Sequence, residues 1–116
     1  MYKPSQRPGL LKVSLIPESP ILFLALRGEL DLSSVDEVPQ DAYASRPDLT
    51  TVLVDLGELG FCDVTGLRAL VEFRREQEAD GRTVSIVRAN PFIWRLLHLC
   101  GLTDRLDFER SADTTV

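Results

Sequence analysis

Hydrophobic and polar residues follow two different periods along this chain, and the shorter period predicts strands. Residues 11–15, LKVSL, alternate apolar and polar positions, as a half-buried strand does. Residues 21–26, ILFLAL, form a more buried run, and a proline-flanked turn at 17–20 makes a hairpin of these two strands the simplest arrangement. Residues 52–54, VLV, are too short a run for a helix and predict a strand buried on both faces, as in a parallel sheet.

Apolar residues that recur at helical spacing predict two helices in the second half of the chain. The first covers about residues 64–79, and either Asp63 or Thr65 can cap its start. An Asp-Gly pair at 80–81 ends it, with the glycine in the left-handed conformation. The second helix occupies residues 90–101, which open on an Asn-Pro pair and close on a glycine.

The sequence signals for a third helix, earlier in the chain, disagree with one another. Ser33 and Ser34 can cap its start, and Glu37 completes a capping box with Ser34. Pro39 opposes this helix, because its ring would clash with the carbonyl of Val35 if both residues were helical. The helix is therefore expected either to begin late or to kink.

The order of these elements defines an α/β fold. With further strands at 83–87 and 106–108, the order is β-β-α-β-α-β-α-β, a mixed, mostly parallel sheet of about four to five strands with covering helices. Residues 1–9 have little apolar content and predict a flexible lead-in. A single domain is expected over 10–110, followed by a C-terminal tail at 111–116.

Composition narrows the function classes. The 116 residues are 44% hydrophobic and 27% charged, which is typical of a globular domain. A net charge of −5 argues against a sequence-independent nucleic-acid binder, whose surface is basic. No apolar run approaches the roughly 18 residues of a membrane span, and the start lacks a signal-peptide core. We therefore expect a cytoplasmic protein without membrane insertion.

Candidate catalytic chemistry is sparse. His98 is the only histidine, and no His/Cys/Asp cluster has metal-ligand spacing. No phosphate-binding loop or dinucleotide fingerprint is present. Cys62 precedes one predicted helix and Cys100 ends the next, so the two cysteines should lie at opposite ends of the sheet. We therefore expect both to be free thiols. We expect no enzyme, no metal site and no cofactor.

The central stretch at 52–70 resembles a known family. Asp-Leu at 55–56, Phe61 and Asp-Val-Thr-Gly-Leu at 63–67 resemble, in order and spacing, the core of STAS domains of the anti-sigma-factor antagonist type. Gly-Glu-Leu-Asp at 28–31 and the closing Leu-Leu-x-x-Cys-Gly-Leu at 96–102 resemble two further segments of that family. The resemblance implies a STAS fold over most of the chain.

The resemblance also implies a docking surface for a partner protein. In the family, two aspartates flank the start of the central helix at one end of the sheet. Carried over residue by residue, the partner-binding residues would be Asp31, Ser33, Asp63, Val64, Thr65, Gly66, Leu67 and Arg68. The implied partner is a cytoplasmic anti-sigma factor, often a serine-kinase-like ATPase, whose capture frees a sigma factor for transcription. A homodimer is left open.

One position departs from the family pattern. The usual phosphorylation site is the hydroxyl residue directly after the second aspartate, and here that residue is Val64, which cannot accept phosphate. The nearest hydroxyl, Thr65, is rotated by about 100° around the helix. Either Thr65 is the phosphorylation site, or the protein is a constitutive antagonist, and we favour the second.

Two other roles fit a STAS domain. The first alternative is a small subunit of a lipid-transporting ABC system, which clamps an ATPase and needs no phosphorylation cycle. The second is a sensory module that binds a small ligand, for which the sequence shows no pocket. The identity of a co-purifying protein would discriminate among the three.

Overall fold

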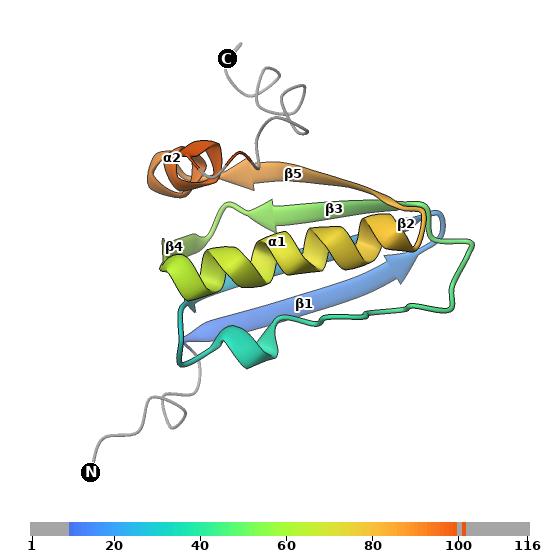
Figure 1. Ribbon diagram of the computed structural model, residues 1–116, viewed down its shortest axis with the longest axis horizontal. Helices are drawn as coiled ribbons and strands as arrows, with labels where there is room; N and C mark the ends of the chain where they lie inside the picture. The colour runs from blue at the N-terminus through green and yellow to red at the C-terminus, as the bar shows by residue number, and fades with distance from the viewer. Residues whose placement is uncertain (1–9, 100, 102–116) are drawn as a thin grey trace.

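One mixed sheet organises the computed structural model, which describes residues 10–99 and 101 (Figure 1). The strands are β1 (Leu11–Glu18), β2 (Ile21–Leu30), β3 (Thr51–Leu56), β4 (Leu59–Cys62) and β5 (Thr83–Ala89). Their order is β1-β2-β3-β5, and the short β4 pairs with the end of β2 beyond β3. Among these described strands, only the β1–β2 pair is antiparallel, which confirms the predicted mixed, mostly parallel α/β sheet.

The core lies on one face of this sheet, under the long helix. Helix α1 (Val64–Ala79) runs across the sheet in Figure 1 and buries Phe73 against it. Along β3, Val52, Val54 and Leu56 are at most 2% exposed, whereas Leu53, which points to the opposite face, is half-buried. The prediction that this strand is buried on both faces was therefore wrong, because α1 covers only one face.

Local sequence signals place both helices. Asp63 is the residue that caps α1, and its Oδ1 accepts a hydrogen bond from the backbone N–H of Gly66 at 2.8 Å. Helix α2 (Pro91–Leu99) packs against β4 and β5, and Asn90 caps it by accepting from the Ile93 N–H at 2.8 Å. The left-handed Gly81, with φ at +86°, confirms the predicted end of α1.

The third predicted helix does not form. Residues Val35–Glu37 make a single 3₁₀ turn, after which residues 38–49 follow an irregular path to β3. Neither expected outcome, a late start or a kink, is observed. Pro39 stops the turn. The Ser34 hydroxyl makes no cap, since it accepts from the Asp31 N–H at 3.1 Å and donates to the Glu29 carbonyl at 2.8 Å.

A buried arginine holds the irregular segment in place. Arg82 is 3% exposed, and its Nε donates to the Leu49 carbonyl at 2.9 Å. Its other nitrogens donate to the carbonyls of Ala42, Tyr43 and Arg46 and, at 2.6 Å, to the side chain of Gln77. The Arg82 side chain therefore donates to backbone carbonyls that, in a helix, would accept from N–H groups of the next turn.

Several predictions fall on residues outside the described range. The flexible lead-in at 1–9, the strand at 106–108 and the tail at 111–116 lie there, as does Cys100. The separation of the two cysteines therefore remains a prediction, although Cys62 itself is buried at the end of β4.

Candidate protein-docking surface

Asp63 joins two segments at the carboxyl end of β2. Its Oδ1 caps α1, as described above, and its Oδ2 accepts a hydrogen bond from the backbone N–H of Leu32 at 3.2 Å. One carboxylate therefore ties the loop after β2 to the start of α1. This places Asp31 and Asp63 at the same end of the sheet, as the sequence resemblance implied.

Asp31 is held as an anion by the two serines that follow it. Its Oδ1 accepts from the Ser33 hydroxyl at 2.6 Å and from the Ser33 N–H at 2.9 Å. The Ser33 hydroxyl bond is the main reason why the pKa of Asp31 is lowered below 3.8. Burial opposes this shift, and the Ser33 N–H and the bonds from Ser34 lower the pKa further. The loop thus presents a fixed negative charge beside the helix start.

Two apolar side chains stand out from this polar loop region. Leu32 is 74% exposed and Val64, the first residue of α1, is 67% exposed. The hydrogen bond from the Leu32 N–H to Asp63 brings Leu32 to the residue that directly precedes Val64. Exposed apolar side chains rimmed by polar groups are typical of protein–protein contacts.

The remaining predicted site residues divide into exposed and buried ones. Arg68 is exposed and Thr65 is half-buried, and both line a groove beside α1. Thr65 lies within the first turn and is not the cap, a role that Asp63 takes. Leu67 is half-buried and packs against the core.

Gly66 is buried, so it offers no side chain to a partner. A Cβ built on it would lie 2.6 Å from the Leu30 carbonyl oxygen and 3.0 Å from the sulfur of Cys62. Its glycine identity is therefore explained by the close packing of α1 on β2. Gly66 therefore supports the surface from below by letting α1 pack closely on β2, and it does not contact a partner through a side chain.

A family model for "Mlab, STAS domain" matches residues 19–108, most of the chain. The chain belongs to the STAS-domain family. No curated protein sequence matches it closely enough to count as a relative.

Solved structures share the STAS fold at low sequence identity. An anti-sigma factor antagonist from Mycobacterium paratuberculosis has a TM-score of 0.68 at 18% identity, covering 90% of this chain and 95% of that one. Unphosphorylated SpoIIAA, an anti-sigma factor antagonist, has a TM-score of 0.65 at 19% identity over 83% and 84%. SLC26A9 has a TM-score of 0.57 at 16% identity, covering 76% of this chain and 17% of that chain.

In this STAS domain, Val64, which has no hydroxyl, occupies the phosphorylation position implied by the resemblance, and the Leu32 N–H binds the preceding residue, Asp63. Leu32 was not among the predicted site residues. The signal that identifies it in the sequence is an isolated leucine between the polar residues Asp31 and Ser33. We define the docking face as the exposed and half-buried residues at this end of the sheet. They are Asp31, Leu32, Ser33, Asp63, Val64, Thr65 and Arg68.

The described residues also bear on other site classes. Neither helix among them has the length and hydropathy that a membrane span requires. Within 10–99 and 101, no three His, Cys, Asp or Glu side chains are grouped as they would be to hold a metal ion.

Proposed function

We propose that this STAS domain is a non-enzymatic anti-sigma-factor antagonist of the cytoplasm. It binds an anti-sigma factor of the serine-kinase-like ATPase type through the docking face and so releases a sigma factor for transcription. The observation that carries the proposal is the exposed pair of Leu32 and Val64 beside the anionic Asp31. The similarity to antagonist structures supports the fold on which this surface is built.

The chemistry of the docking face suits a protein partner. Leu32 and Val64 offer apolar contact area at the entry to α1, where desolvation on binding is favourable. The Asp31 carboxylate, fixed by Ser33, gives the contact an orientation, since a partner cation or N–H group must meet it.

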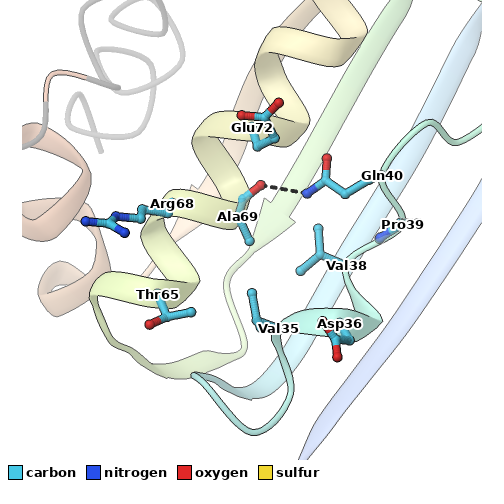
Figure 2. A pocket seen from close by; sticks show the side chains of 9 residues that line it. All are labelled: Val35, Asp36, Val38, Pro39, Gln40, Thr65, Arg68, Ala69 and Glu72. Atoms are coloured by element: carbon cyan, nitrogen blue, oxygen red, sulfur yellow. Dashed lines mark hydrogen bonds between the residues drawn. The ribbon is translucent and has the colours of Figure 1, made fainter.

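The proposed antagonist works without the usual phosphorylation switch. Phosphate at the start of a helix would be tolerated by the helix and would oppose the partner by its bulk and charge. Val64 cannot carry the phosphate, and Thr65 lines the groove beside α1 and is half-buried (Figure 2). We therefore expect regulation by abundance or by another signal.

Restoring the hydroxyl should install the switch. Val64→Ser, incubated with a serine kinase of the anti-sigma-factor type and ATP, should gain one phosphate by mass spectrometry, and the native chain should gain none. Phosphate on Thr65 of the native chain, together with weaker partner binding, would contradict the constitutive version.

The identity of the partner tests the function itself. Affinity-tagged native protein should co-purify a serine-kinase-like anti-sigma factor, identified by mass spectrometry. Val64→Glu should abolish this capture, because it places a charge in the apolar contact while leaving an acidic residue where a helix start favours one. Ile16→Glu is the matched control, since Ile16 is also an exposed apolar residue, on β1, and its replacement should leave capture intact. Capture that survives Val64→Glu would exclude this surface.

A second candidate is a STAS subunit of an ABC-type lipid transport system. The exposed Val64 favours it as well, because a permanent clamp on an ATPase needs no phosphorylation site. Co-purification of an ABC ATPase in place of an anti-sigma factor would establish this role. Both candidates use the docking face, so Val64→Glu should disrupt either complex.

A further inference from the structure

An open groove lies between α1 and the segment that follows β2. It has a volume of about 740 Å³, and Figure 2 shows its lining from close by. One wall is the face of α1 and the other is the 3₁₀ turn with the residues after it. The lining residues are Val35, Asp36, Val38, Pro39, Gln40, Thr65, Arg68, Ala69 and Glu72.

The groove exists because the predicted third helix is absent. Pro39 ends the 3₁₀ turn, so the chain runs alongside α1 instead of packing a helix against it. The Gln40 side chain holds the two walls together, since its Nε2 donates to the Ala69 carbonyl at 3.0 Å. The floor is apolar, with Val38 and Ala69 buried and Val35 half-buried.

The rim of the groove is mainly acidic. Asp36 and Glu72 are exposed on opposite walls, and Arg68 is the only basic residue among those that line it. Just beyond the groove, Glu76 shares a hydrogen bond with Asp41, and this contact, with further repulsion from Glu72, raises the pKa of Glu76. Carboxylates are therefore crowded along this edge, and a cation placed there would relieve their repulsion.

We propose that the groove binds a basic amphipathic helix of the protein that occupies the docking face. Apolar side chains at helical spacing would cover the floor, and lysines or arginines on either flank would meet the carboxylates of Asp36 and Glu72. The groove is continuous with the docking face, because Thr65 and Arg68 belong to both. The proposal rests on the proposed function only in assigning this helix to the docking partner.

The lining favours a peptide over a small molecule. Sites for small molecules usually enclose their ligand and direct a few buried polar groups at it. Here the buried lining residues, Val38 and Ala69, are apolar, and the charged residues Asp36, Arg68 and Glu72 are exposed. An open groove with an apolar floor and a charged rim matches a helix-in-groove contact.

A synthetic peptide provides the test without any cellular partner. The probe is a leucine–lysine amphipathic peptide of about 14 residues, roughly four helical turns, titrated into the ¹⁵N-labelled full chain. We expect amide shifts concentrated at Val38, Gln40, Ala69 and Glu72, with helical signal induced in the peptide. The same peptide with every lysine replaced by glutamate should not bind.

Matched charge reversals separate the groove from general charge attraction. Glu72→Lys should weaken peptide binding by about fivefold, since it exchanges an attraction for a repulsion. Glu18→Lys changes the net charge equally, at an exposed site on β1 away from the groove, and should weaken binding less than twofold. Equal weakening by both variants, or shifts centred outside the groove, would overturn the proposal.

The outcomes also separate this proposal from the proposed function. Peptide binding should survive Val64→Glu, which disrupts only the docking face. If an anti-sigma factor co-purifies but the peptide does not bind in the groove, the groove proposal alone fails. If the peptide binds as mapped but neither an anti-sigma factor nor an ABC ATPase co-purifies, the proposed function fails and the groove remains a helix-binding site.

Discussion

Two connections of similar length join parallel strands in this domain, and they are built by different means. Residues 63–82 connect β4 to β5 through the regular helix α1. Residues 31–50 connect β2 to β3 through one 3₁₀ turn and an irregular stretch. Helix α1 satisfies its backbone groups internally and by its Asp63 cap, whereas the irregular stretch depends on Arg82, which lies at the end of the other connection.

This difference shows how an element without regular hydrogen bonding becomes dependent on a single side chain. Each turn of a helix stabilises the next, so its stability is spread over many bonds. In the irregular connection, the carbonyls of Ala42, Tyr43, Arg46 and Leu49 converge on one buried guanidinium. The segment that continues from the groove wall to β3 is therefore held by a residue that lies outside both the groove and the docking face.

The largest effect should come from Arg82→Met. The substitution leaves several backbone carbonyls without their donor inside the protein, which should cost about 3–5 kcal/mol of unfolding free energy. Urea denaturation followed by circular dichroism measures this change. Arg46→Met is the control, because the Arg46 side chain makes an exposed ion pair with Asp48 and should contribute no more than about 1 kcal/mol. Equal costs for both variants would show that the irregular connection does not depend on Arg82.

Gly66→Ala tests the packing of the regular connection and should lower the free energy of unfolding by about 1–3 kcal/mol. Alanine is the better helix former by about 1 kcal/mol, but its Cβ would lie 2.6 Å from the Leu30 backbone oxygen, so α1 must shift away from β2. Gly60→Ala is the control, since the nearest atom to its Cβ is 3.7 Å away. A stabilised Gly66→Ala variant would mean that α1 does not pack as closely on β2 as described.

Pro39→Ala tests which force keeps the first connection irregular. We expect no gain of helical circular dichroism, because Asp41 and Tyr43 have φ values of 60° and 53° and the Arg82 bonds retain that path. Stability should fall by up to about 1 kcal/mol, as the unfolded chain gains freedom. A clear increase in helical signal would assign the irregularity to Pro39 alone.

The smallest effect concerns the start of the irregular connection. Because the pKa of Asp31 is lowered, its ionisation adds stability at pH values above the unfolded-state pKa of about 3.8, and this contribution is lost as the pH falls through the folded-state value. An NMR titration should place the Asp31 pKa below 3.8. Ser33→Ala should raise it, since the Ser33 hydroxyl donates the shortest bond to this carboxylate. An unchanged pKa in Ser33→Ala would remove the serine from this role.

The features that were predicted correctly are determined by residues close to one another in the sequence. The alternation at 11–15, the spacing within 64–79, the cap at Asn90 and the left-handed Gly81 all depend on residues within a few positions of one another. The motif resemblance added the placement of Asp31 and Asp63 at one end of the sheet. Those local signals were sufficient for the class of fold and for the region of the candidate site.

Contacts between distant residues decided the rest. Burial of β3 on one face, the pairing of β4 with β2 and the close packing of Gly66 on Leu30 follow from how the elements meet. The prediction of a helix after Ser33 failed because Pro39 ends the turn and the carbonyls of Ala42 and Leu49 bind Arg82, 33–40 positions further along the chain. A capping box records only the local preference for a helix, and long-range hydrogen bonds to a buried charge can outweigh it.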